Sequence, residues 1–259
     1  MAASTTVFSS FQVFEGEPFG FKMLPVEGGS FTMGETNTQH QVADFFMAAT
    51  PVTQCLWQQI MGNNPSHFIG KQRPVEEVSW FDAVVFCNAL SEKTGKIPYY
   101  YHDSAFSKPF GKEKNQYALL KNLDKKTPIF FHQKANGYRL ASEAEWGYAA
   151  RGGNQTHDFE FSGSENLDLV GWYDGNSNQE TKPVGLKIPN ELGIFDMSGN
   201  VWEWCEDWYS DNRSRRVYRG GGWLNYSGYC RTAFRHDDSP VLRHRDIGFR
   251  LCAFLQSVG

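Results

Sequence analysis

Apolar residues alternate or recur with helical spacing in the first 150 residues, and this pattern predicts two strands followed by three helices. Residues 21–34 predict a strand pair around Gly28-Gly29, because apolar and polar residues alternate on both sides of that turn. Residues 53–61 have helical spacing and stop at Gly62. Residues 1–20, rich in Ser, Thr and Phe, are interpreted as an N-terminal arm.

Serine caps mark the starts of the other two helices. Ser79 precedes residues 80–94, where the apolar residues form one stripe that includes Cys87 as a small buried side chain. Ser142 and Glu145 form a capping box, because the hydroxyl accepts from the Glu145 amide while the carboxylate reaches back. The third helix therefore begins just after Ser142.

The remaining segments predict loops and short strands around a single body. Residues 97–137 are polar, lysine-rich and broken by prolines, and glycine, asparagine, aspartate and aromatic residues predominate after residue 154. There is no internal repeat and no low-complexity linker, so we expect one domain over residues 21–259. Hydrophobic residues make up 40% of the 259 positions and aromatic residues 15%, which suits a globular α+β body with many tight turns.

Charge and composition exclude several classes of function. A formal net charge of −4 does not suit a nucleic-acid binder, which is usually basic. No apolar run is long enough to span a bilayer, and the first residues lack the features of a signal peptide. No cysteine lies in a CxxC pair, no two of the seven histidines are spaced i, i+4, and no P-loop, dinucleotide glycine fingerprint or serine elbow is present.

Seven motifs, in a fixed order from about residue 21 to 254, resemble the formylglycine-generating-enzyme (sulfatase-modifying factor) family. They are Gly28-Gly-Ser-Phe-Thr-Met-Gly34, Pro51-Val-Thr-Gln54, Arg73-Pro-Val-Glu-Glu-Val-Ser-Trp80, the Tyr138–Gly153 segment, Gly199-Asn-Val-Trp-Glu-Trp204, Arg219-Gly-Gly-Gly-Trp223 and Gly248-Phe-Arg250. The resemblance implies a C-type lectin-like α+β fold with much irregular structure and a binding face made by the C-terminal part.

Enzymes of that family hold copper(I) with two cysteines a few residues apart, since this soft ion prefers sulfur. The second of these positions matches Cys230, but the first falls on Asn225, whose amide cannot replace a thiolate. Cys205 and Cys252 lie in or beside scaffold motifs and are expected to point inward. We therefore expect no catalytic residues and interpret Cys230 as a buried structural thiol.

Residues 217–250 carry a narrower resemblance, to the TvpA-like variable proteins that diversity-generating retroelements produce in spirochaetes. In that group a fixed scaffold alternates with positions whose asparagine-type codons never become Lys, Glu, Gln, Met or Trp. After removal of the scaffold residues, the remaining positions contain none of these five. These candidate ligand-binding positions are Tyr218, Gly222, Leu224, Asn225, Tyr226, Tyr229, Phe234, His236, Asp237, Asp238, Leu242, His244, Arg245 and Asp246.

The same positions have the chemistry of a protein-binding surface. Rigid aromatic rings give a large contact area at low entropic cost, and their polar neighbours give adaptable hydrogen bonds. The alternative is that half of the rings belong to the core. The scaffold residues Arg231, Arg235, Arg243 and Arg250 are expected to brace loop carbonyls and carboxylates, with an anion-binding patch as the alternative.

A further segment matches a calcium-binding stretch of the family. Asp196, Gly199, Val201 and Glu203 would supply two carboxylates and two backbone carbonyls, although this set is short of the about 6–8 oxygen ligands that calcium prefers. A capped turn is the alternative reading. We otherwise expect no cofactor.

Together, these observations predict a non-catalytic binding protein whose C-terminal surface recognises a protein or cell-surface ligand. The alternatives are a copper-dependent formylglycine-generating oxidase or another enzyme on the same fold. We expect a monomer without nucleic-acid partners or a membrane span. The resemblance implies display at the cell surface.

Overall fold

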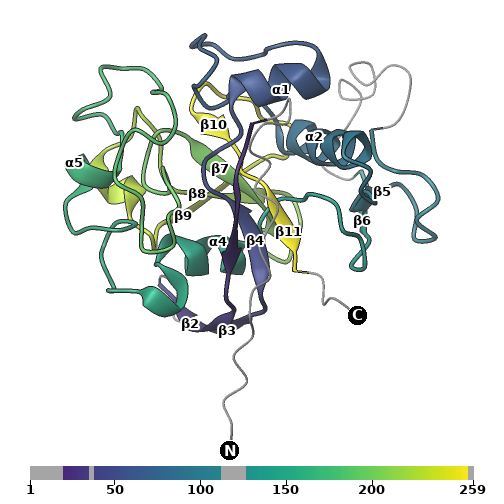
Figure 1. Ribbon diagram of the computed structural model, residues 1–259, viewed down its shortest axis with the longest axis horizontal. Helices are drawn as coiled ribbons and strands as arrows, with labels where there is room; N and C mark the ends of the chain where they lie inside the picture. Colours follow the sequence, from purple (N-terminus) through teal and green to yellow (C-terminus); the bar gives the residue numbers. More distant parts are fainter. Residues whose placement is uncertain (1–19, 35–37, 112–126, 256–259) are drawn as a thin grey trace, which may run out of the picture.

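Two sheets lie side by side at the centre of the protein (Figure 1). The first is antiparallel, with β4 (Phe45–Ala48) between β1 (Met23–Val26) and β11 (Cys252–Phe254). The second has the order β10–β7–β8–β9, formed by Ile247–Gly248, Trp202–Trp208, Arg216–Arg219 and Arg235–Asp238. This computed structural model describes residues 20–34, 38–111 and 127–255.

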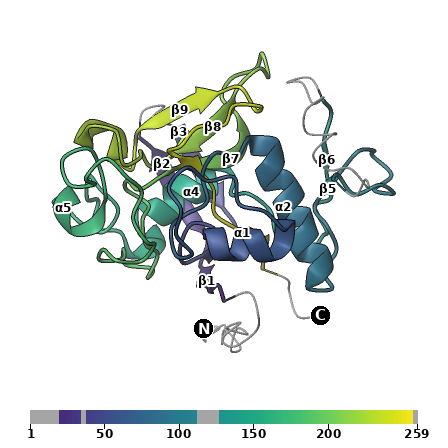
Figure 2. The same cartoon turned by 90° about the horizontal axis from the view of Figure 1, so that it is seen from above.

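Short strand pairs and helices surround this centre (Figures 1 and 2). The strand pairs are β2 (Gly29–Met33) with β3 (Thr38–Val42), and β5 (Tyr100–Tyr101) with β6 (Phe130–Phe131). The helices are α1 (Gln54–Met61), α2 (Trp80–Lys93), α4 (Glu143–Ala150) and α5 (Leu167–Val170), with 3-10 turns η1 (Gly153–Gln155) and η2 (Ser227–Cys230). None of the helices within the described ranges has the length and apolarity needed to cross a membrane.

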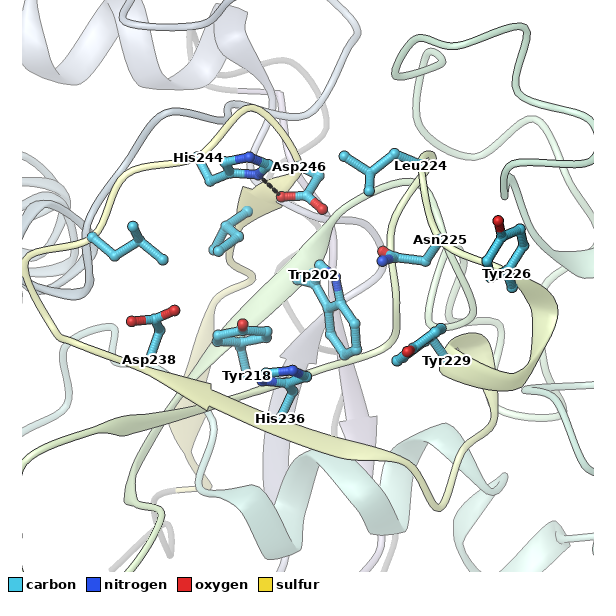
Figure 3. Close-up of a pocket in the computed structure, with 12 residues that line it drawn as sticks. Trp202, Tyr218, Leu224, Asn225, Tyr226, Tyr229, His236, Asp238, His244 and Asp246 are labelled. Atoms are coloured by element: carbon cyan, nitrogen blue, oxygen red, sulfur yellow. Dashed lines mark hydrogen bonds and ion pairs between the residues drawn. The ribbon is translucent and has the colours of Figure 1, made fainter.

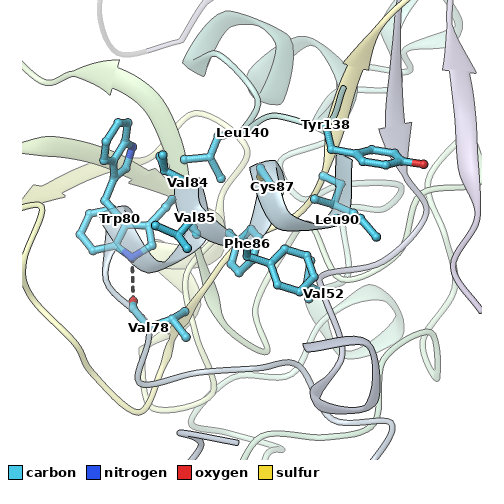
Figure 4. Close-up of a cluster of buried hydrophobic side chains, with 14 of the residues drawn as sticks. Val52, Val78, Trp80, Val84, Val85, Phe86, Cys87, Leu90, Tyr138 and Leu140 are labelled. Atoms are coloured by element: carbon cyan, nitrogen blue, oxygen red, sulfur yellow. Dashed lines mark hydrogen bonds between the residues drawn. The ribbon is translucent and has the colours of Figure 1, made fainter. Parts of the chain in front are cut away.

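Successive side chains of a strand point to opposite faces of the sheet, so β7 contributes to two hydrophobic clusters, one on each face. Trp202 and Trp204 of β7 join the apolar cluster around α2, whereas Cys205 joins the cluster around α4. The indole of Trp80 at the start of α2 donates to the Cys205 carbonyl oxygen at 2.8 Å. Figure 4 shows part of the α2 cluster, in which Phe86 and Leu90 lie against loop and strand residues. Each strand thus presents one set of side chains to each helix.

The predicted helix starts are confirmed. The Thr53 hydroxyl accepts from the Leu56 amide, and Ser79 and Ser142 both form capping boxes. Gly62 ends α1 with a φ of 79°, a left-handed conformation that glycine adopts without strain.

Two details of the sequence interpretation are wrong. The strands of residues 21–34 exist, but β1 pairs with β4 and β2 pairs with β3, so they do not form a hairpin with one another. The α2 helix does not bury a single stripe, because most of its circumference is covered and even Asp82 and Asn88 are buried. The predicted arm, apart from Gly20, and residues 112–126 of the predicted loop lie outside the described residues.

A buried ion pair joins the end of the chain to the central sheet. Arg250 donates to both carboxylate oxygens of Glu203 at 2.6 Å, and both side chains are 1% exposed. The same guanidinium donates to the carbonyl oxygens of Ala48 and Phe195, and Trp146 donates its indole N–H to Glu203. One arginine therefore connects β4, β7 and the 195 loop.

Replacement of Glu203 by Gln is expected to destabilise the fold by about 3–5 kcal/mol, because it leaves the Arg250 charge buried without a counter-charge. Glu160→Gln is the matched control, since its pair with Arg231 is 4.0 Å long and half exposed, and a loss below about 1 kcal/mol is expected. The free energy of unfolding in urea measures both, and equal losses would contradict the role of the buried pair.

Candidate ligand-binding pocket

Three neighbouring strands form the aromatic floor of a pocket (Figure 3). Tyr218 of β8 lies opposite His236 of β9, and their rings stack with centroids 5.2 Å apart. Trp202 of β7 packs edge-on against Tyr218 at 5.0 Å. Strand geometry explains these contacts, since Tyr218 and His236 lie directly across the ladder and Trp202 is two residues from Trp204, the residue opposite Tyr218.

Two loops build the walls of this pocket, whose volume is about 550 Å³. In Figure 3 the segment from residue 224 to 229 lies on one side, with Tyr226 and Tyr229, and the loop carrying His244 and Asp246 lies on another. Hydrogen bonds hold the backbone of each wall in place. The Asp174 amide donates to the Asn225 carbonyl oxygen, and the Trp202 amide donates to the Asp246 carbonyl oxygen.

Ten of the fourteen candidate positions line this one pocket. They are Tyr218, Leu224, Asn225, Tyr226, Tyr229, His236, Asp238, Leu242, His244 and Asp246. Their exposure differs, because Tyr226 is 73% exposed at the rim while Tyr218 and Asp246 are 6% and 4% exposed. Tyr218 in the floor and Asp246 in the wall are therefore buried and are not part of an open surface. The alternative that half of the rings are core is correct for Tyr218.

The other four candidates lie beside the pocket. Phe234 packs against Tyr229, with ring centroids 4.9 Å apart, and Asp237 forms an ion pair with Arg215 at 3.0 Å. The guanidinium of Arg245 lies over the Trp223 ring. Gly222 is buried and donates its amide to the Asn225 side chain.

Sequence reasoning missed two lining residues, Trp202 and Ile247. Trp202 lies in β7, within the Gly199–Trp204 motif of the family, and Ile247 lies in β10, directly before the Gly248-Phe-Arg250 motif. Strand pairing places Ile247 next to Trp202. The signal was the family motif itself, which contains an aromatic residue on the same strand face as the buried Trp204.

The charged groups of the pocket are carboxylates and one histidine paired with a carboxylate. His244 makes a short hydrogen bond through Nδ1 to Asp246, and this bond raises the pKa of His244 above its usual value. Burial raises the pKa of Glu76 to about 7; this side chain does not line the pocket but interacts electrostatically with Asp246. The pocket therefore becomes more negative as the pH rises through neutrality.

The opposite face of β8 and β9 is braced by arginines. Arg235 donates to both oxygens of Glu143 at 2.8 and 2.6 Å, and Arg219 lies 3.4 Å from the same carboxylate. Arg219 also donates to the carbonyl oxygens of Thr232 and Ala233. Glu143, at the start of α4, thus fixes the strand that carries His236 and the turn that precedes it.

The remaining scaffold arginines also bind loop carbonyls or carboxylates, as predicted. Arg243 donates to both oxygens of Asp82, at the start of α2, and Arg231 donates to the Gly228 carbonyl oxygen at 2.9 Å. The Arg243 contact ties a wall loop to the start of α2, whereas the Arg231 contact lies within the 227–231 segment itself. The alternative of an anion-binding patch has no support in these pairings.

Cys230 lies behind the wall and does not line the pocket. It is completely buried, and Gly221 passes so close that an added Cβ atom would meet the Cys230 sulfur at 2.6 Å. The φ of Gly221 is 73°, so the tight turn requires glycine in two ways. Burial raises the pKa of the Cys230 thiol to about 12, which disfavours the thiolate that a copper site requires.

The predicted calcium ligands fit the structure only in part. The Oδ1 atom of Asp196 is buried with no hydrogen-bond partner among the described residues, as a ligand oxygen would be. Glu203, however, is occupied by Arg250 and Trp146. Gly199 and Val201 are buried nearby in the chain. The four residues as arranged do not form the expected set, and calcium binding stays a prediction.

Comparison with known proteins identifies the family. A sulfatase-modifying factor enzyme 1-like domain matches residues 11–254. The chain belongs to this family. The predicted α+β fold, a C-type lectin-like fold of the formylglycine-generating-enzyme type, is confirmed by the structural neighbours of this family member.

Three relatives show the range of functions in the family. Treponema denticola variable protein 1 has 33% identity and a TM-score of 0.80, with 91% of this chain and 95% of that chain covered. The chaperone protein LppX of Paenibacillus barcinonensis is 40% identical over 228 residues, which are 78% of this chain and 79% of the relative. A formylglycine-generating enzyme of Streptomyces coelicolor is 34% identical over 148 residues, 45% of this chain and 46% of the enzyme. The likeness to the variable protein and to LppX is compatible with a non-enzymatic, ligand-binding role.

Thiol labelling tests the burial of Cys230. All five cysteines are free and four of them are buried, so a thiol reagent such as DTNB is expected to modify only Cys55 rapidly in the native protein. All five are expected to react after unfolding in guanidinium. A Cys55→Ser variant should remove the fast phase, and a fast phase that survives it would contradict the burial of the other four.

Proposed function

We propose that the protein is a non-catalytic binding protein whose pocket recognises a protein ligand through exchangeable side chains. The observation that carries the proposal is the separation of the two faces of β8 and β9. Tyr218 and His236 face the pocket, while Arg219 and Arg235 face Glu143 on the other side. Because strands alternate their side chains, the pocket face is free to change without loss of the arginine contacts.

The rim residues support the exchange of side chains. Tyr226 is largely exposed, and His236 and His244 are exposed as well, so their replacement leaves few buried contacts broken. The loop backbone does not depend on them, since it is held by amide hydrogen bonds and by the buried Trp223. The likeness to a spirochaete variable protein supports the same interpretation, together with display at the cell surface.

The alternative is a copper-dependent oxidase, because formylglycine-generating enzymes are among the relatives. Two points argue against it. The resemblance assigns the first cysteine position to Asn225, whose side chain accepts from the Gly222 amide. The Cys230 thiol is buried away from the pocket, so a substrate in the pocket would not reach it.

Sequence variation among gene copies tests the proposed function directly. Sequencing of the 3′ segment of the gene in sibling copies and isolates should find the differences concentrated at the ten lining positions that were predicted, with Trp202, Arg219, Arg235 and Arg250 unchanged. An even spread of differences over the segment would contradict the proposal.

A pair of display libraries supplies the laboratory control. One library randomises Tyr226, Tyr229, His236 and His244, and the other randomises the same number of bracing residues, Arg219, Arg235, Arg243 and Arg250. Most members of the first are expected to be folded and protease-resistant, and most of the second are not. Equal folded fractions would mean that the scaffold and the exchangeable set are not distinct.

Copper(I) titration of the reduced protein distinguishes the binding protein from the copper-dependent oxidase. We expect no stoichiometric copper uptake, because one buried thiol does not make a dithiolate site. The Cys230→Ser variant is the control. Uptake of about one copper per chain that disappears in this variant would establish the oxidase alternative.

A further inference from the structure

Two carboxylates carry the negative charge of the pocket. Asp238 and Asp246 lie on different sides of the aromatic floor in Figure 3, and no lysine or arginine is among the twelve lining residues. Asp246 is almost fully buried, so its charge is only weakly screened by solvent. The lining therefore has an excess of negative charge with no fixed cation inside.

The basic side chains near the pocket are already engaged. Arg215 contacts both Asp237 and Asp238 from outside the pocket. Its side chain is 53% exposed, so it competes only weakly with a ligand cation for Asp238. Arg243 is bound to Asp82, and Arg245 lies over Trp223. His244 contacts Asp246 directly, and this pair carries a full negative charge only while the imidazole is neutral.

Aromatic rings complete the lining. Trp202 and Tyr218 form the floor, and Tyr226 and Tyr229 stand at the wall and rim. The face of an aromatic ring attracts a cation within about 6 Å, and the attraction is largest where water is excluded. A group of four aromatic side chains with two carboxylates matches a flat, positively charged group that stacks on a ring while it donates to an acid.

We propose that the pocket binds an arginine side chain presented by a partner protein. This inference rests on the proposed function and specifies the chemistry of the ligand for this chain. A volume of about 550 Å³ holds such a side chain together with its neighbours, and the exposed Tyr226 adds contact area around it. The opening is therefore suited to a protruding segment of a protein.

Protonation of the pocket modulates this binding in one direction. The groups that face His244 are Asp246, Glu77 and Arg245, and Glu76 lies next to Asp246. Below the raised pKa of His244 its imidazolium neutralises Asp246, and above it the aspartate is free to attract a ligand cation. Deprotonation of Glu76 near pH 7 adds negative charge in the same range. The affinity for a cation is thus expected to rise as the pH increases through the pKa of Glu76, about 7, and through the raised pKa of His244.

The test is a titration of the full chain with N-acetyl-arginine amide, followed by NMR through the indole N–H signals. Acetyl-citrulline amide, which has nearly the same shape without the charge, is the matched control. We expect arginine amide to shift the Trp202 signal, assigned with a Trp202→Phe variant, and citrulline amide to leave it unchanged. Added salt should weaken the binding, as it screens the carboxylates.

Variants test which carboxylates bind the arginine ligand. Asp238→Asn and Asp246→Asn are each expected to weaken arginine binding by roughly five-fold or more, a typical effect for a close, partly buried charge pair. Asp211→Asn removes the same charge at an exposed position outside the lining and is expected to change nothing. Because Asp246 is buried and its replacement can affect folding, Asp238→Asn alone decides the question.

Three outcomes would overturn the cation inference. They are no arginine binding (whether or not a neutral methyl glycoside binds at Trp202 instead), equal binding of citrulline, or arginine binding that Asp238→Asn leaves unchanged. None of them touches the proposed function, which depends on variation at the lining positions and on the folded display library. If sequence differences were spread evenly but arginine still bound, the proposed function would be contradicted and the cation inference would stand.

Discussion

The architecture depends on the carboxylate of Glu143, which holds two arginines from adjacent strands beneath the pocket. Burial of charge is costly, and the pairing repays that cost only when the geometry is good and the remaining donors are satisfied. Here Arg235 is bidentate, and Arg219 uses further donors on the Thr232 and Ala233 carbonyl oxygens. The arrangement ties an irregular segment, which has few ladder hydrogen bonds of its own, to a capped helix.

Arg250 and Arg243 fix other loops in the same way, through contacts with carboxylates and carbonyl oxygens. Arg250 joins Glu203 to two backbone carbonyl oxygens, and Arg243 reaches the acid of the α2 capping box. Asp82 therefore both caps a helix and anchors a wall loop. An arginine offers five donors in a fixed plane, so one side chain replaces several backbone hydrogen bonds that a regular strand would provide. Stability in this region comes from side chains that face away from the ligand.

Local signals in the sequence predicted the helices well and the strand partners poorly. Ser79, Ser142 and Gly62 determine helix ends through hydrogen bonds within a few residues, so the sequence alone reveals them. The partner of β1 is β4, and β11 joins the same sheet from more than 200 residues away, which no local pattern indicates. The near-complete burial of α2 has the same origin, since distant segments cover its second side.

The sequence predicted which positions belong to the candidate site better than it predicted how those residues are arranged. The resemblance, after removal of the scaffold residues, gave fourteen candidate positions, and ten of them line the pocket. It did not reveal which of them form the floor. Tyr218 is buried because its ring packs against Trp202, Trp204 and His236. Asp246 is buried directly before β10, where its carbonyl oxygen accepts from the Trp202 amide. Under the proposed function, Trp202 would be the fixed aromatic residue of the floor. Exchange of the side chains around it would then change the charge and shape of the pocket above a constant ring.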